Sequence, residues 1–296
     1  MTKELLSQRK VNSFSTSSSS TSKPDHATPV LSLIDRISIN QITTYHWSLE
    51  ESLRGLVACG IPAVGLWNRK ILDLETAQSA ELVIDSGIKV STISLAGGFT
   101  GSNEYPFEEA ITDAIQLIEF GGQVNAAAVQ IASGPRAGHT LNHARELTVD
   151  ALKRLGDVAA SNGTRLALKT MKNPLARNWT FLNSIESTLE LIDTCQHPAV
   201  GIAIDPAHIC LENSAKNLIA DIISLIAAVQ ISEIEHGESV QELFPDFDVM
   251  EAINDAGYQG YYDLEVWCEQ FWQSDYSETL TNLRLACQSE TPSQFS

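Results

Sequence analysis

The sequence predicts an α/β protein built as a single (β/α)8 barrel (a TIM barrel), and three observations lead to this prediction. Apolar runs with β-branched residues alternate with amphipathic stretches of helical periodicity from residue 31 to residue 290. Eight such strand–helix units follow one another, in a length close to the ~250 residues of a typical barrel. No linker divides the series, so we expect one domain. A doubly wound open sheet is the alternative, although eight uninterrupted units would be unusual for it.

The expected strands combine apolar alternation with β-branched residues. They span residues 36–40, 63–67, 89–96, 126–133, 165–171, 200–205, 227–233 and 261–267. The expected helices span residues 48–59, 73–86, 106–121, 140–162, 181–195, 214–226, 248–257 and 275–288. Ser48, followed three residues later by Glu51, is a capping-box spacing. Glycine stands where four helices should end, at positions 60, 87, 163 and 257.

The ends of the chain differ from the barrel in composition. Residues 1–30 are rich in Ser and Thr and poor in apolar residues, so we expect a disordered tail. This segment lacks the apolar stretch of a secretory signal, and residues 291–296 are expected to form a short C-terminal tail. No apolar run approaches the ~18 residues of a membrane span.

Net charge and cysteine content restrict the classes of binding partner and the cellular location that we expect. The net charge of −18 argues against nucleic acid, whose binding requires Lys and Arg to neutralise phosphates. The five cysteines are odd in number and lack C-x-x-C spacing, which favours a reducing, cytoplasmic location over disulfides or a cysteine zinc site. We expect a small-molecule ligand and no membrane or nucleic-acid partner, and the sequence leaves homo-oligomer formation open.

The segment 200–208 marks the first candidate site. Val200, Ile202 and Ile204 share one face of a strand that Pro206 should end. Asp205 and His208 would then lie at the C-terminal tip, where α/β proteins place their chemistry. The structural alternative is that Asp205 caps a turn and His208 satisfies a loop.

Alternation also predicts a polar barrel interior. The apolar face of each strand must meet the helices, so the other face points inward. The inward residues are Ser38, Asn40, Gly65, Trp67, Ser94, Gln130, Lys169, Asp205, Gln230 and Glu265. Ordinary barrels are filled with bulky branched residues, so this interior predicts a site for a polar ligand.

Four of these side chains should converge near the mouth. Lys169, Asp205, Gln230 and Glu265 stand late in strands five to eight. Buried charges cost stability unless they pair, so a cluster of this kind points to function. The alternative is a structural ion pair of Lys169 with Asp205 or Glu265 that closes the barrel.

Loop residues add weaker candidates. Arg177 follows strand five and is a candidate for holding a phosphate or carboxylate, unless it is a solvated loop residue. His236 follows strand seven near the mouth. Trp67, with Phe271 and Trp272, is placed to stack on a sugar ring, unless these aromatics only pack.

Several segments together resemble a known family. They are residues 204–208 (Ile-Asp-Pro-Ala-His), 229–233 (Val-Gln-Ile-Ser-Glu), 257–266, 37–40 and 60–67. In order and strand position they resemble the xylose isomerase-like TIM barrels, which include sugar isomerases and epimerases, inosose dehydratases and endonuclease IV (the AP endonuclease 2 type). The resemblance extends over residues 34–287.

The resemblance implies a divalent metal (Mn, Mg, Co or Zn) on a Glu, an Asp, a His and a Glu of strands five to eight. Asp205 and Glu265 match the second and fourth ligands, and His208 matches a substrate-contacting residue. Lys169 and Gln230 stand where Glu and His are expected. Lys has no lone pair to give a metal and Gln is a poor ligand, so we expect an altered site and no certain cofactor.

A charge comparison suggests a hypothesis. Three carboxylates, a neutral His and a dication carry −1 together, and so do Lys169, Asp205, Glu265 and a neutral Gln230. The Lys169 ammonium would then occupy the electrostatic place of the metal.

The function expected from these residues and the resemblance is a sugar, sugar phosphate or polyol isomerase or epimerase. Glu265 would be the base, with Lys169 or His208 as the acid. The substrate-binding residues would be Asp205, Gln230, Trp67, Arg177, Asn40, Gln130 and His236.

Other chemistries stay open. Two-base epimerisation would need Asp205 or His208 as the second base, whereas one-base isomerisation or dehydration needs only Glu265. A Schiff base on Lys169 is disfavoured, because two carboxylates would keep it an ammonium. The alternative from another class is a non-catalytic carbohydrate-binding or regulatory barrel. Endonuclease IV-like repair is disfavoured by the acidic charge and the lack of a histidine-rich ligand set.

Overall fold

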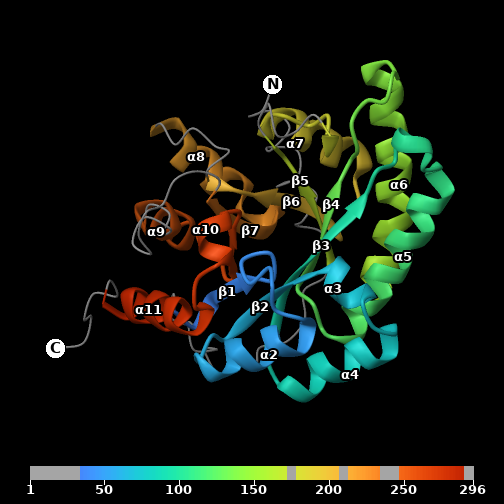
Figure 1. Cartoon of the computed structure of the whole chain (residues 1–296). Coiled ribbons are helices and arrows are strands. Elements are labelled where there is room, and N and C mark those ends of the chain that lie inside the picture. The colour runs from blue at the N-terminus through green and yellow to red at the C-terminus, as the bar shows by residue number, and fades with distance from the viewer. Residues whose placement is uncertain (1–33, 172–177, 207–212, 234–246, 290–296) are drawn as a thin grey trace, which may run out of the picture.

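The computed structural model describes residues 34–171, 178–206, 213–233 and 247–289. Eight parallel strands close into a barrel in the order β1 to β8, which confirms the predicted fold (Figure 1). The strands are β1 (Ile37–Asn40), β2 (Ala63–Trp67), β3 (Lys89–Gly97), β4 (Ala128–Ala132), β5 (Arg165–Lys169), β6 (Val200–Ile204), β7 (Ile226–Glu233) and β8 (Tyr262–Val266).

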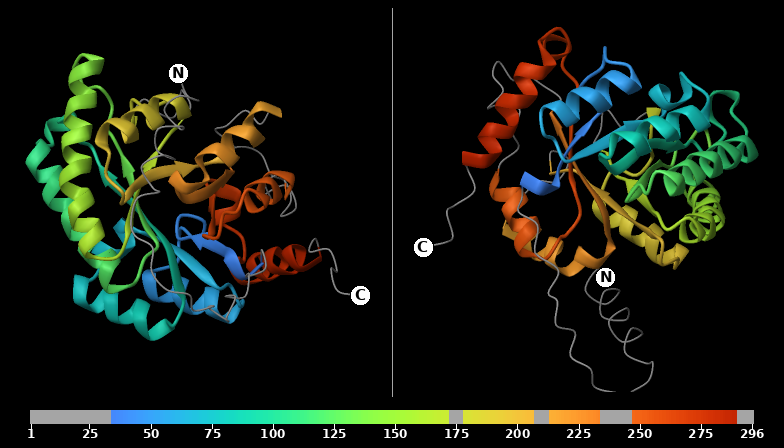
Figure 2. Two further views of the ribbon diagram at one scale, coloured as in Figure 1. Left: turned by 180° about the vertical axis from the view of Figure 1, so that it is seen from behind. Right: turned by 90° about the horizontal axis from the view of Figure 1, so that it is seen from below.

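Helices surround the barrel on all sides (Figure 2). They are α2 (Leu49–Ala58), α3 (Asn68–Leu72), α4 (Thr76–Ser86), α5 (Phe107–Gln123), α6 (Leu141–Ser161), α7 (Ile185–Cys195), α8 (Asn213–Ile222), α9 (Phe247–Asp255), α10 (Glu269–Trp272) and α11 (Tyr276–Ser289). The 3-10 turns are η1 (Ile34–Arg36), η2 (Ser102–Glu104) and η5 (Ile223–Leu225). The short helices α3 and α10 had no counterpart among the expected elements.

Local signals set several boundaries. The capping box forms, because the Ser48 hydroxyl accepts from the Glu51 N–H at 3.2 Å and the Glu51 carboxylate accepts from the Ser48 N–H at 2.8 Å. Gly87 ends α4 in the left-handed conformation, with φ of 70°. Two helix boundaries were wrong. The helix α7 begins at Ile185, not near residue 181, because the Phe181 N–H donates to the Gly134 carbonyl at 3.0 Å. The helix α8 ends at Ile222, not near residue 226, because the 3-10 turn η5 and strand β7 follow it.

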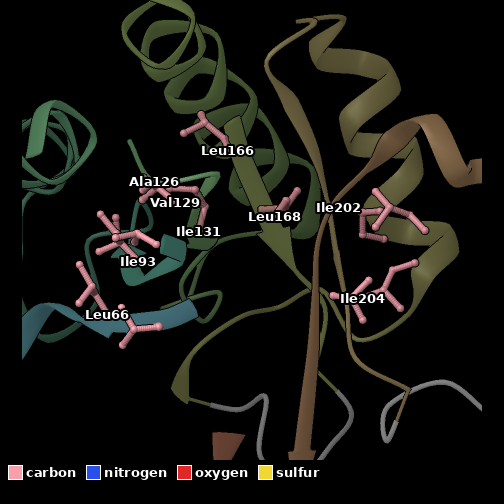
Figure 3. Close-up of a cluster of buried hydrophobic side chains, with 14 of the residues drawn as sticks. Leu66, Ile93, Ala126, Val129, Ile131, Leu166, Leu168, Ile202 and Ile204 are labelled. Carbon is pink, nitrogen blue, oxygen red and sulfur yellow. The ribbon is translucent and has the colours of Figure 1, made fainter. Parts of the chain in front are cut away.

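The apolar faces of the strands meet the helices, as alternation predicts. Figure 3 shows this layer on the β2–β6 side of the barrel. Its buried members include Leu66, Ile93, Val129, Ile131, Leu166, Leu168, Ile202 and Ile204. This layer forms the main hydrophobic core, and it holds each strand with its other face turned inward.

A second, smaller apolar cluster lies inside the barrel. It consists of Ala128, Ala167, Ala203 and Ala228, one from each of β4 to β7. Strands β4 and β7, and also β5 and β7, contact each other across the interior. Such close approach requires small side chains, so these alanines fill the β4–β7 side of the barrel below its mouth.

Three sequence predictions concern the ends of the chain and the membrane. Residues 1–30 and 291–296, the expected tails, lie outside the described residues and stay predictions. In the part of the chain that the structure describes, no helix is both long and apolar enough to cross a membrane.

Candidate functional site

An ammonium and two carboxylates lie at the C-terminal ends of β5, β6 and β8. Lys169 is the last residue of β5, Asp205 directly follows β6, and Glu265 is the fourth residue of β8. They are only 8%, 4% and 5% exposed. Lys169 Nζ lies 3.9 Å from Glu265 Oε2. The structure therefore brings Lys169 and Glu265 together as a nearly buried ion pair.

Hydrogen bonds orient both carboxylates. Trp267 Nε1 donates to Glu265 Oε1 at 2.5 Å, so that the other carboxylate oxygen, Oε2, faces Lys169. Ser232 Oγ donates to Asp205 Oδ2 at 2.5 Å, and Ser232 N–H donates to Oδ1 at 3.4 Å. Ser232 and Glu265 are register partners on β7 and β8, so one short stretch of sheet holds Asp205 beside Glu265.

Two glutamines face inward near these charges. Gln130 on β4 and Gln230 on β7 are 0% and 1% exposed. Neither the nitrogen nor the oxygen of either side-chain amide has a hydrogen-bond partner among the described residues. Most buried polar groups in proteins are satisfied, so this pair is a candidate ligand contact.

Asp263 is a site residue that the sequence-based candidates did not include. It is fully buried on the inner face of β8, where strand alternation alone could have placed it. Its carboxylate accepts from Ser38 Oγ at 2.8 Å, Asn40 Nδ2 at 2.9 Å and Thr92 Oγ1 at 2.8 Å. Burial raises the pKa of Asp263 to about 6, against the hydrogen bonds, which lower it.

Asn40 belongs to the hydrogen-bond network around Asp263. Besides donating to Asp263, Asn40 accepts from the Ile42 N–H at 3.1 Å, and its side chain is fully buried. The structure thus places Asn40 below the mouth, where it positions Asp263. Its role as a substrate-binding residue stays a prediction.

Aromatic side chains line the mouth next to β1, β2 and β8. Tyr45 stacks on Trp272 with ring centroids 4.5 Å apart and lies 5.8 Å from Trp67. The Arg69 guanidinium lies over Trp67 at 5.6 Å. Phe271 instead packs against Tyr276 in the core. Of the three aromatics singled out from sequence, Trp67 and Trp272 therefore both contact Tyr45.

Three candidates fall on parts of the chain that are not described. Arg177, His208 and His236 lie outside the described residues, so their places at the mouth stay predictions.

A divalent metal does not fit the described side chains at this position. Within those residues, no three His, Cys, Asp or Glu side chains converge as a metal-ligating group. The chemistry of the donors gives the reason. A cation on Glu265 would have the Lys169 ammonium as its neighbour at 3.9 Å, and an ammonium repels a cation and has no lone pair to offer it.

The Asp263 pKa predicts a pH effect on stability. In the folded protein this pKa is raised from 3.8 to about 6, so Asp263 favours folding at low pH and this contribution is lost as pH rises through 6. Asp263→Asn should remove that pH dependence. We expect the stability difference between wild type and variant to change by on the order of 3 kcal/mol between pH 4 and pH 7.

Urea unfolding of both proteins at pH 4, 5, 6 and 7 measures this difference. Asp35→Asn, on the surface turn η1, serves as the control for removing an exposed carboxylate. A difference that stays constant across the range would contradict a raised pKa for Asp263.

Gly65 on β2 makes the room for the Asp263 carboxylate. A Cβ at position 65 would lie 2.4 Å from both carboxylate oxygens, which is far closer than van der Waals contact. Because four hydrogen bonds hold Asp263, from Ser38, Asn40, Ser91 and Thr92, it cannot move aside without losing some of them. Gly65→Ala should therefore lower the free energy of unfolding by about 3 kcal/mol.

Chemical denaturation checks this expectation in a double-mutant cycle. Gly65→Ala combined with Asp263→Ala should recover part of the loss, since the clash is with Asp263 itself. Gly87→Ala is the control, because a Cβ there meets nothing within 4 Å and the only cost comes from φ of +70°, about 1 kcal/mol. Additive effects at positions 65 and 263 would argue against the clash.

Comparison with known proteins agrees with this architecture. A family model described as the xylose isomerase-like TIM barrel matches residues 54–286. Protein SMc04130 from Sinorhizobium meliloti 1021 matches with a TM-score of 0.77 and 20% identity, over 86% of this chain and 98% of that one. No curated protein matches the chain.

Two further solved structures are similar to this chain in fold. The 3-keto-D-glucoside 4-epimerase YcjR from E. coli, in its apo form, has a TM-score of 0.69 and 16% identity, over 86% of this chain and 99% of that one. The IolI protein with a binding zinc atom has a TM-score of 0.68 and 18% identity, over 86% and 96%. At these identities the likeness shows the fold alone. With the family match over most of its length, the chain belongs to the xylose isomerase-like TIM barrel family.

Proposed function

We propose that this barrel binds a small carbohydrate (a sugar, sugar phosphate or polyol) at its C-terminal mouth and catalyses an isomerase- or epimerase-type proton transfer. The observation that carries the proposal is the Lys169–Glu265 pair, 3.9 Å apart and nearly buried in a polar interior. A barrel that needed only stability would fill this position with branched apolar residues. Sugar epimerases among the structural neighbours support the substrate class.

The chemistry assigned to the cluster is proton abstraction next to a carbonyl. Glu265 removes the proton, and its orientation comes from the Trp267 hydrogen bond. Lys169 donates to the carbonyl oxygen and stabilises the negative charge that develops there. Asp205, held by Ser232, accepts from a neighbouring hydroxyl. One base on one face favours isomerisation between adjacent carbons, and epimerisation requires a second base, Asp205 or His208.

The proposal includes an altered metal site. The Lys169 ammonium takes the electrostatic place of the divalent cation that the family resemblance implies. Support comes from the ion-pair distance to Glu265 and from the charge of −1 shared by the two arrangements.

Metal titration tests this proposal directly. The purified protein is titrated with Mn, Mg, Co and Zn while metal content and thermal unfolding are measured, and a panel of sugars is tested in parallel. We expect no stabilisation by millimolar metal and a higher Tm with at least one sugar. Tight stoichiometric metal would contradict the ammonium-for-metal proposal, and the absence of any sugar effect would contradict the carbohydrate site.

A second function has one observation in its favour. Gln230 and Lys169 replace two residues that the family resemblance assigns to the metal, which suits a barrel that kept its pocket and lost its chemistry. In this alternative the protein is a non-catalytic carbohydrate-binding or regulatory barrel. Turnover measurements on wild type and a Glu265 variant separate the two functions.

A further inference from the structure

The two inward glutamines lie above the alanine cluster. Gln130 is two residues after Ala128 on β4, and Gln230 is two residues after Ala228 on β7. Because β4 and β7 contact each other across the interior, the two amides lie on facing walls of the barrel. Beneath them, on the β4–β7 side of the barrel, the alanine methyl groups offer no hydrogen-bond partner to the amides.

Neighbouring amides of the same kind are satisfied, at least in part. Gln41 accepts from the Trp67 N–H at 3.0 Å, and Asn40 uses both atoms of its amide. By contrast, all four polar atoms of Gln130 and Gln230 lack partners within the described residues although both side chains are buried. Such amides reduce stability unless a ligand satisfies them.

The charges around the glutamines restrict what can bind there. Asp263 is the register partner of Gln230 on the neighbouring strand, so a buried carboxyl group lies beside the glutamines and disfavours an anion there. An amide offers a donor and an acceptor, and a hydroxyl group complements both.

We infer that Gln130 and Gln230 form an inner subsite that takes the uncharged, hydroxyl-bearing end of a sugar. This subsite rests on the proposed carbohydrate function and refines it, because a substrate with a charged group at both ends is excluded. The reacting carbons then lie beside Glu265 and Lys169, and the uncharged end lies against the glutamines.

A matched series of sugars tests the inference. D-glucose, D-gluconate and D-glucarate share one carbon skeleton and carry no, one or two carboxylates, and D-xylose, D-xylonate and D-xylarate form a second series. Binding is measured by calorimetry on the full-length protein. We expect the sugar and its monoacid to bind in at least one series, and the diacid to bind at least about tenfold more weakly.

Variants of the glutamines give an independent readout. Gln130→Leu and Gln230→Leu keep similar volume and remove the unsatisfied amides. Each should raise the Tm of the free protein by about 2–4 °C and weaken sugar binding about 10- to 100-fold. Gln130→Met, with an unbranched side chain, repeats the test without a change of shape.

Thr100→Val is the matched control. The Thr100 hydroxyl is also buried without a partner among the described residues, but Thr100 lies in the β3–α5 connection and not at an inward strand position. This variant should raise the Tm and leave sugar affinity unchanged.

Two outcomes would overturn the inner subsite. Leucine variants that bind the sugar as tightly as wild type would refute it while the proposed function stands, and so would a diacid that binds as tightly as its sugar. Wild-type protein that binds no sugar of a wider neutral panel would instead refute the carbohydrate function together with the subsite.

Discussion

Glu265→Gln is expected to lower kcat by about 10²- to 10⁴-fold while changing the affinity for the sugar little. The amide keeps the shape of the side chain and can still accept from Trp267 Nε1, which bonds Glu265 Oε1. It cannot take a proton from carbon. Exchange of the substrate's carbon-bound hydrogen in D2O, followed by NMR, measures the proton transfer even when the product is unidentified.

Trp267→Phe is the control for this variant. It removes the hydrogen bond to Glu265 but leaves the carboxylate and its ion pair with Lys169, so we expect a loss of only about tenfold. If wild type binds sugar yet exchanges no hydrogen, and Glu265→Gln binds equally well, the barrel is a binding protein. Unchanged exchange in Glu265→Gln would show that another group is the base.

Lys169→Glu combined with Gln230→His is expected to create a metal site at the mouth of the barrel. The double variant supplies the Glu, Asp, His and Glu that the family resemblance implies. Without metal it should be less stable than wild type, because a carboxylate replaces the ammonium that pairs with Glu265. Metal at about 100 times its Kd should then stabilise it by about 2.7 kcal/mol, or roughly 5–10 °C in Tm.

The measurement is a thermal shift with Mn, Co and Zn, together with metal content after gel filtration. Lys169→Leu combined with Gln230→Leu is the control, since it removes the same side chains and supplies no ligand at either position. A double variant that remains indifferent to metal would contradict the assignment of Lys169 and Gln230 to the ligand positions of the family.

Layers of different chemistry follow one another along the barrel axis. Alanines line the β4–β7 side of the interior. Gln130, Lys169 and Gln230 each stand two residues beyond one of these alanines, and Glu265 stands two residues beyond Asp263 on β8. The polar layers cost stability, which is a common property of functional sites.

Strand alternation by itself determined which side chains face the interior. A strand has a side-chain period of two, and one face of each strand must be buried against helices, so a single register was possible. Gln130, Lys169, Gln230 and Glu265 are accordingly buried where the pattern placed them. The same rule applied fully would also have included Asp263.

Only the tertiary structure decided which inward groups meet. Asp263 on β8 accepts hydrogen bonds from Ser38 on β1 and Thr92 on β3, and its carboxylate fits only because Gly65 on β2 has no side chain. The pairing of β2 with β3 shifts register between Val64 and Gly65, so the Ser91 hydroxyl also donates to Asp263. Strict alternation would turn the neighbouring residues Ser91 and Thr92 to opposite faces of the strand. Lys169 lies against Glu265, whereas the sequence left Asp205 as an equal alternative. Such pairings depend on how far each strand is displaced along the barrel axis when the sheet closes, and that displacement comes from packing between strands distant in sequence.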